Sequence, residues 1–123
     1  MEFQVTKEDQ DKISTFGKVH VQMKELMAQC EDAQRELLAV QDASGDALAM
    51  DEDVEGGLLL RVGECFFEVT PDEAVAELEK READTQKQVD ELQKQIDSRR
   101  AQLDELKHEL YGKFGRDAIN LGD

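Results

Sequence analysis

The sequence predicts a mainly α-helical chain in which two long helices form an antiparallel two-helix coiled coil and are joined by a β-hairpin. Apolar residues recur at alternating spacings of three and four along residues 6–49 and 71–115, as in the heptad repeat of coiled coils. Between these segments, residues 58–69 read as strand, turn and strand, with the turn at Gly63 and Glu64. Because a short hairpin joins helices of similar length, we predict that they fold back on each other and pack antiparallel.

The first helix is predicted to begin after Thr6, whose hydroxyl can cap the N-terminus, and Glu8 and Asp9 suit the positive end of the helix dipole. One polar residue, Ser44, interrupts its apolar seam. The seam comprises Phe16, Val19, Met23, Leu26, Cys30, Ala33, Leu37, Val40, Ser44 and Ala47. Residues 50–57 follow as an acidic stretch, which we interpret as a solvated linker, with an acidic binding loop as the alternative.

The second helix has the clearest start signal, because Thr70-Pro71-Asp72-Glu73 forms a capping box with proline at the first helical position. Thr70 can accept a hydrogen bond from the Glu73 amide, and the Glu73 carboxylate can accept one from the Thr70 amide. The predicted seam is Val75, Leu78, Glu82, Thr85, Val89, Leu92, Ile96, Arg99, Leu103, Leu106, Leu110 and Lys113. Its polar members lower stability but help to fix the register of the two helices.

Composition limits the function classes. At 123 residues the chain is expected to form a single domain over 1–123, with a tail at 116–123. The 30 acidic residues outnumber the 15 basic ones, and the net charge of −15 argues against nucleic acid or an anionic membrane as partner. A basic or partly unfolded protein remains a possible partner. Cys30 and Cys65 are read as buried, reduced thiols, which together with the lack of a signal peptide indicates the cytoplasm or nucleus.

No catalytic pattern is evident. The Gly63-Glu64 turn lacks the Lys and hydroxyl residue of a phosphate-binding loop, and no serine has the neighbours of a nucleophile. His20 and His108 have no evident set of further metal ligands and are read as surface residues. We therefore expect a non-enzymatic protein without cofactor or metal.

The predicted hairpin has one fully apolar face, which indicates assembly with other chains. An isolated two-stranded ribbon is marginal in water, and its open edges invite further strands. Alternation along the two strands groups the apolar residues on one face, as a barrel interior requires. This subunit-assembly face consists of Leu58, Leu60, Val62, Cys65, Phe67 and Val69.

Antiparallel pairing brings both chain ends together, and this end is rich in apolar residues. They are Phe3, Val5, Ile13, Phe16, Leu110, Tyr111, Phe114, Ile119 and Leu121. Two interpretations stand side by side: these side chains seal the end of the coiled coil, or they form an exposed binding surface. Sealing is weighed equally for Ile13, Phe16, Leu110 and Phe114. It is disfavoured for the residues that lie beyond the helices, Phe3, Val5, Ile119 and Leu121, because no core is expected there.

Two end motifs resemble a known family. They are Val5-Thr6 with Glu8-Asp9-Gln10, Lys12-Ile13 and Phe16 at the start, and Leu110-Tyr111-Gly112-Lys113-Phe114-Gly115 with Ile119-Asn120-Leu121 at the end. Together with the acidic linker and the hairpin, they resemble β-type subunits of prefoldin over nearly the whole chain. The resemblance implies a heterohexamer of two α-type and four β-type subunits, whose hairpins join in an inter-subunit β-barrel.

The resemblance also implies a function, which is ATP-independent capture of non-native polypeptides, notably actin and tubulin, and their transfer to the cytosolic chaperonin. The apolar residues at the chain ends would then form the client-binding tip. The acidic surface could steer basic segments of a client or of the chaperonin. The alternative is a structural coiled-coil tether that holds other chains together and binds no client, for which we expect a sealed end.

Overall fold

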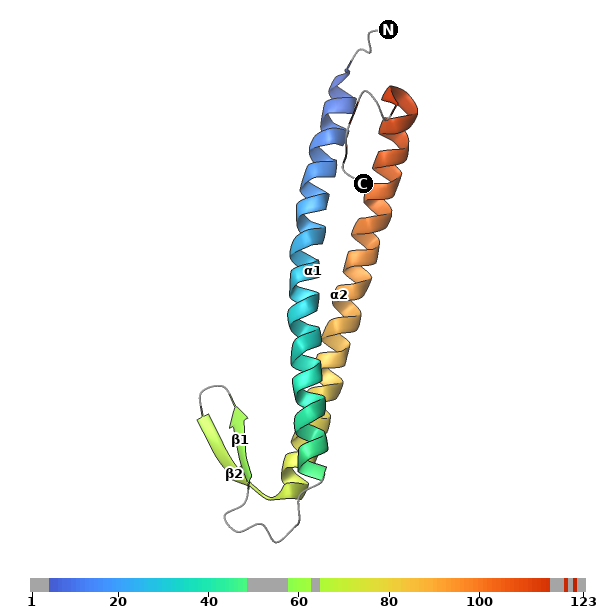
Figure 1. Ribbon diagram of the computed structural model, residues 1–123. Coiled ribbons are helices and arrows are strands. Elements are labelled where there is room, and N and C mark those ends of the chain that lie inside the picture. The colour runs from blue at the N-terminus through green and yellow to red at the C-terminus, as the bar shows by residue number, and fades with distance from the viewer. Residues whose placement is uncertain (1–4, 49–57, 63–64, 116–118, 120, 122–123) are drawn as a thin grey trace. The chain divides into compact units, whose positions relative to one another are not determined.

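The computed structural model describes residues 5–48, 58–62, 65–115, 119 and 121. The elements follow the predicted order of helix, hairpin and helix (Figure 1). They are α1 (Lys7–Leu48), β1 (Leu58–Val62), β2 (Cys65–Val69) and α2 (Pro71–Phe114). The predicted linker at 50–57 and the turn at Gly63 and Glu64 lie outside the described residues.

A reciprocal capping box starts α1. The Thr6 amide donates to Asp9 Oδ2 at 2.9 Å, and the Asp9 amide donates to Thr6 Oγ1 at 3.2 Å. These two bonds satisfy backbone and side-chain groups that the first helical turn leaves without a partner. The sequence indicated Thr6 as the cap, but placed Asp9 only as a favourable charge near the helix dipole.

The second helix starts as predicted and ends on a glycine. The Glu73 amide donates to Thr70 Oγ1 at 3.2 Å, which is the first of the two hydrogen bonds expected of that capping box. At the other end, the Gly115 amide donates to the Tyr111 carbonyl at 2.8 Å, and Gly115 has φ +77°. This left-handed conformation favours glycine and turns the chain away from the helix axis.

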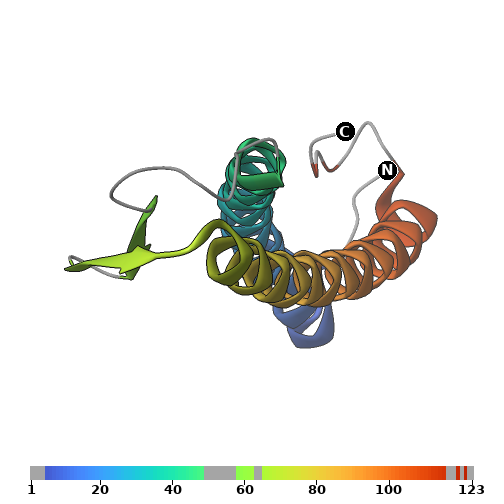
Figure 2. The ribbon, with the colours of Figure 1, turned by 90° about the horizontal axis from the view of Figure 1, so that it is seen from below.

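The two strands pair antiparallel and form the sheet that the described residues contain. Leu60 lies opposite Phe67 in this register, and β2 leads directly into α2 (Figure 2). Three of the five backbone pairs join positions predicted to share the assembly face: Leu58 with Val69, Leu60 with Phe67, and Val62 with Cys65. The backbone register therefore agrees with the alternation predicted from the sequence.

The chain divides into two compact units, each built on a pair of antiparallel helical segments. We call residues 30–90 the hairpin unit, and residues 1–29 together with 91–123 the terminal unit. Within the described part of the chain, neither helix contains a stretch long and apolar enough to span a membrane.

The hairpin unit has a small aliphatic core. Its buried members are Val40, Ala47, Ala74 and Leu78, against which Ala43, Val69 and Val75 pack. Ser44 is buried in the seam. Gln41 Nε2 donates to Oε1 of Glu82, which lies on the other helix, with 3.3 Å between the two atoms. Glu82, predicted as a polar interruption, is thus partnered across the helix pair. Cys30 is buried and free, as predicted.

The terminal unit has a core of larger residues. Phe16, Val19 and Leu103 are buried together, and the half-buried Met23, Leu106 and Leu121 pack against them. The members from the helices lie near the start of α1 and the end of α2, which antiparallel pairing brings together (Figure 1). This core sets the surroundings of the residues that the sequence indicated for binding.

Candidate functional site

Three of the predicted binding residues are buried within the terminal unit. Phe16 is 6% exposed, Leu110 is 1% exposed and Phe114 is 7% exposed. The Lys113 ammonium also lies over the ring of Phe114 in a cation–π contact, 5.4 Å from the ring centroid. In this structure these three side chains close the end of the coiled coil, which is the sealing interpretation.

Other predicted residues are accessible. Val5 is 51% exposed and Ile13 is 37% exposed, while Tyr111 and Ile119 are half-buried. Phe3 lies outside the described residues. The apolar surface that this unit offers in the described chain therefore includes Val5 and Ile13.

The expectation that no core is available beyond the helices is wrong for Leu121. Its side chain packs against the buried cluster of Phe16, Val19 and Leu103. The turn at Gly115 makes such a return possible, because it redirects the chain after the last helical residue. The signal that could have found this contact is the isolated apolar pair Ile119 and Leu121 following a glycine.

An ion pair links the first turn of α1 to the last turn of α2. The Lys113 ammonium contacts the Asp9 carboxylate, and Asp9 is 4% exposed. This hydrogen bond, with the one from the Thr6 amide, lowers the pKa of Asp9 from 3.8 to about 2. Nearby, Lys12 Nζ lies 3.2 Å from Glu109 Oε2 at the surface. Asp9 and Lys113 were not predicted as partners, since 104 residues separate them in the sequence.

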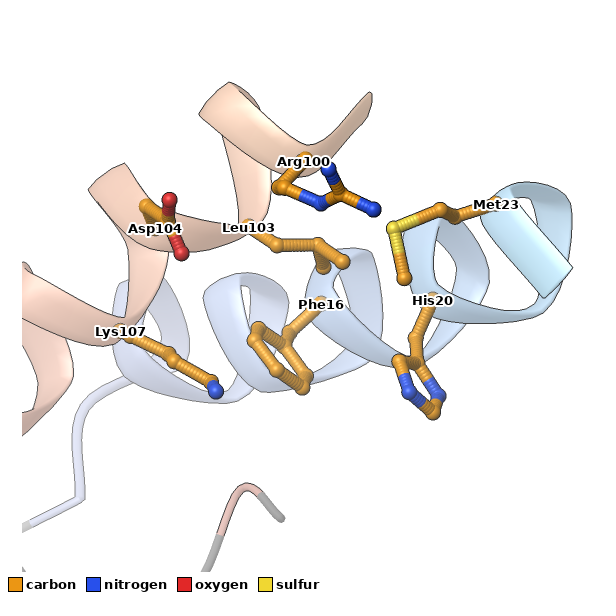
Figure 3. Close-up of a pocket in the computed structure, with 7 residues that line it drawn as sticks. All are labelled: Phe16, His20, Met23, Arg100, Leu103, Asp104 and Lys107. Atoms are coloured by element: carbon orange, nitrogen blue, oxygen red, sulfur yellow. The ribbon is translucent and has the colours of Figure 1, made fainter. Parts of the chain in front are cut away.

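A groove of about 230 Å³ lies between the two helices of this unit (Figure 3). Phe16, Met23 and Leu103 supply its apolar floor. The lining residues are Phe16, His20, Met23, Arg100, Leu103, Asp104 and Lys107. The His20 ring stacks on Phe16, with 6.1 Å between ring centroids and 11° between planes. The groove thus combines an apolar floor with polar and charged side chains on its rim.

Of the hairpin's side chains outside the predicted assembly face, Phe66 is 62% exposed. Large exposed aromatic residues are frequent at protein interfaces. In the described chain β1 and β2 pair only with each other, so each strand has one edge without a strand beside it. These features make the hairpin a second candidate surface, suited to other chains.

Negative charge is unevenly divided between the units. The hairpin unit carries 18 acidic and 5 basic residues, a net charge of −13, whereas the terminal unit carries 12 acidic and 10 basic residues, a net charge of −2. The acidic surface expected from composition is therefore a property of the hairpin unit. The terminal unit, where Phe16 and the groove lie, is close to neutral.

Comparison with known proteins places the chain. Residues 10–117 match the family described as prefoldin subunit. The chain belongs to the prefoldin subunit family. Human prefoldin subunit 4 is 31% identical over 119 residues, covering 95% of this chain and 86% of the human one. A probable prefoldin subunit 4 from Caenorhabditis briggsae is 28% identical over 117 residues, covering 95% and 92%.

The fold agrees with this family. The crystal structure of the prefoldin β subunit from Thermococcus strain KS-1 superimposes with a TM-score of 0.80 at 20% identity, covering 90% of this chain and 96% of that one. The predicted resemblance to β-type prefoldin subunits and the predicted fold of two helices and a hairpin are both confirmed.

Proposed function

We propose that this chain is a single-domain β-type subunit of a heterohexameric prefoldin in the cytoplasm. It captures non-native polypeptides such as actin and tubulin chains and transfers them to the cytosolic chaperonin, without catalysis, nucleotide or cofactor. The observation that carries this proposal is the match to the prefoldin subunit family over residues 10–117. The exposed Val5 and Ile13 in the terminal unit support a binding role for that unit.

Assembly is assigned to the hairpin. Its two strands have open edges, and a ribbon of this size needs further strands or a covering layer for stability. We propose that Leu58, Leu60, Val62, Cys65 and Phe67 face the interior of a β-barrel shared between subunits. Val69, which the sequence placed on the same face, instead packs against the helical core of its own unit. The partners are two α-type and three further β-type prefoldin subunits.

Capture is proposed to be multivalent. One terminal unit offers a small apolar surface, so a single contact with a client is weak. Several such units on one particle raise the effective concentration of each for the same client, and avidity can exceed single-site affinity by about 10²–10⁴. Release then needs only the stepwise loss of contacts to a competing chaperonin.

The test uses the reconstituted hexamer and chemically unfolded actin. We expect the hexamer to suppress actin aggregation, measured by light scattering, and to lose part of this ability when Val5 and Ile13 are both replaced by Asp. The matched control is Val21→Asp, which alters another exposed apolar residue of the terminal unit. Unchanged suppression by the double variant would contradict the assignment of Val5 and Ile13.

A structural tether is the second candidate, and the burial of Phe16, Leu110 and Phe114 favours it. A tether has a sealed end and no need for exposed apolar residues there. The same experiment separates the two functions. A hexamer that assembles, yet leaves actin aggregation unchanged under all conditions, supports the tether.

A further inference from the structure

The groove of the terminal unit has a floor and a rim of different chemistry. Phe16 and Leu103, which form the floor, are among the buried residues of this unit. Arg100 and Lys107 on α2 bring two cations to the rim, and Asp104 is the acid among the lining residues (Figure 3). Arg100 also pairs with the exposed Asp97 next to the groove, at 3.9 Å. Among the lining residues cations outnumber acids, in a chain of net charge −15.

One residue beyond α2, Leu121, already packs on residues of this floor. Leu121 packs on the cluster that contains Phe16 and Leu103, two residues that also line the groove. In sequence, residues 119–123 read Ile-Asn-Leu-Gly-Asp, which is an aliphatic pair followed by an acid. Leu121 thus shows which kind of side chain the cluster accepts.

We propose that this groove binds a short polypeptide segment that carries an aliphatic side chain and a neighbouring carboxylate, and that Leu121 competes for its floor within the same chain. The aliphatic side chain packs on Phe16 and Leu103, and Arg100 and Lys107 attract the carboxylate. The extension to client segments rests on the proposed function, since a client segment would pack on the same cluster as Leu121.

Competition within one chain has a measurable consequence. A segment tethered by a few residues is present at an effective concentration in the millimolar range, so it masks a weak site from a free ligand. Removing the Leu121 side chain therefore increases binding of a free segment. This direction is opposite to that expected if Leu121 itself were a client-binding residue.

The probe is a fluorescein-labelled peptide with the sequence of residues 116–123, and the readout is fluorescence anisotropy with the full chain. We expect the Leu121→Asp chain to bind this peptide roughly tenfold more tightly than the unchanged chain. The Val21→Asp chain, altered at a residue that is 55% exposed in the same unit, should bind like the unchanged chain. Circular dichroism checks that all three chains are equally helical.

Substitutions in the peptide and in the rim of the groove test whether binding is specific. A peptide with Leu121→Asp should not bind, and Arg100→Glu in the Leu121→Asp chain should weaken binding several-fold. Lys94→Glu, an exposed residue on α2 outside the groove lining, should leave binding unchanged. Equal affinities of the Leu121→Asp and unchanged chains, or equal effects of Arg100→Glu and Lys94→Glu, would overturn the proposal.

The two proposals fail in distinguishable ways. Peptide binding is measured without clients or other subunits, so its absence leaves capture by the hexamer untouched. Peptide binding by the chain, together with no effect of the hexamer on actin aggregation, overturns the proposed function alone.

Discussion

At the scale of a single residue, Asp9 links two parts of the terminal unit. Its carboxylate accepts from the Thr6 amide at 2.9 Å, its amide donates to Thr6 Oγ1, and its side chain pairs with Lys113. Charged side chains that are largely buried are stabilising only when such partners are present. Asp9 therefore couples the start of α1 to the end of α2.

This coupling predicts a pH dependence with a definite sign. The pKa of Asp9 is 3.8 in the absence of its partners and about 2 in the folded chain. The folded chain thus binds fewer protons in this interval, so the stabilisation is present above 3.8 and is lost as the pH falls towards 2. Thermal unfolding should show this loss when it is measured from about pH 5 to about pH 2. The upper limit lies about one unit above the ordinary pKa of 3.8.

The matched variants are Asp9→Asn and Asp11→Asn. Asp9→Asn should lower the melting temperature at pH 7 and flatten its dependence on acid, whereas Asp11, exposed on the same helix, should have little effect. An Asp9→Asn chain with an unchanged acid profile would show that the Lys113 contact does not stabilise the fold.

Arg99 is a second informative residue, because its Nε atom is buried and has no hydrogen-bond partner within the described structure. A buried donor without a partner costs about 1–3 kcal/mol. We predict that Arg99→Leu, which extends the apolar seam between Ile96 and Leu103, raises the free energy of unfolding by about 1 kcal/mol. Urea denaturation measures it, with Lys94→Leu as the exposed control. A destabilised Arg99→Leu chain would indicate that the guanidinium has a role in the register.

At the scale of elements, the C-terminus of α2 depends on the backbone of Gly115. Its φ of +77° is strained for any residue with a Cβ, although a Cβ there would meet nothing within 4 Å. Gly112, one turn earlier, also has open space but no positive φ. The two glycines therefore separate backbone strain from steric crowding.

Alanine substitutions at these two positions should change the free energy of unfolding in opposite directions. Gly115→Ala is predicted to destabilise the chain by about 1 kcal/mol, because the alanine must adopt the left-handed conformation. Gly112→Ala is predicted to stabilise it by about 0.5–1 kcal/mol, because alanine has the higher helix propensity. Thermal or urea unfolding measures both changes in the free energy of unfolding. Equal signs for both substitutions would mean that the turn at Gly115 does not persist in solution.

The hairpin yields a prediction about assembly. Leu60 and Phe67 are backbone partners in the middle of the two strands. If they face a shared barrel interior, replacing both by Ser should abolish incorporation into a hexamer, because polar groups would be buried without partners. The helices of the isolated chain should keep their circular dichroism signal.

Native mass spectrometry of the co-expressed subunits reads out this result. The control is Glu68→Gln. Glu68 is exposed, lies in β2 beside Phe67, and is outside the predicted assembly face. Normal incorporation of the double Ser variant would contradict the barrel assignment of Leu60 and Phe67.

For the whole molecule, the main feature is the division of charge between units. A net charge of −13 falls on the hairpin unit and −2 on the terminal unit. If the terminal unit binds non-native chains, as proposed, its low net charge lets it accept clients of either sign. We expect the acidic hairpin unit to attract basic segments through long-range steering.

This division predicts which interactions depend on salt. The association of a basic peptide such as oligolysine with this chain should slow strongly as ionic strength rises. The reason is that salt screening shortens the Debye length, to about 8 Å at 0.15 M. Stopped-flow fluorescence measures the rate. Glu79→Lys in the hairpin unit should reduce it more than Glu105→Lys in the terminal unit. Equal effects of the two reversals would mean that steering does not depend on the charge division.

The sequence by itself determined the elements of this protein. The heptad spacing, Thr6 and the Thr70-Pro71 start signal predicted both helices, and the strand–turn–strand pattern predicted the hairpin. These signals are short-range, because capping and helix periodicity act over a few residues. Even the family was recognisable from two end motifs.

Only the tertiary structure decided how the terminal unit is built. It brought Asp9 to Lys113, placed Phe16 and Leu110 in the core and returned Leu121 to the Phe16 cluster. Burial and long-range ion pairing depend on which distant residues meet, and no periodicity encodes this for a tail beyond the helices. The same residue types could seal this end or bind a client, and their packing in three dimensions separates the buried residues from those left exposed.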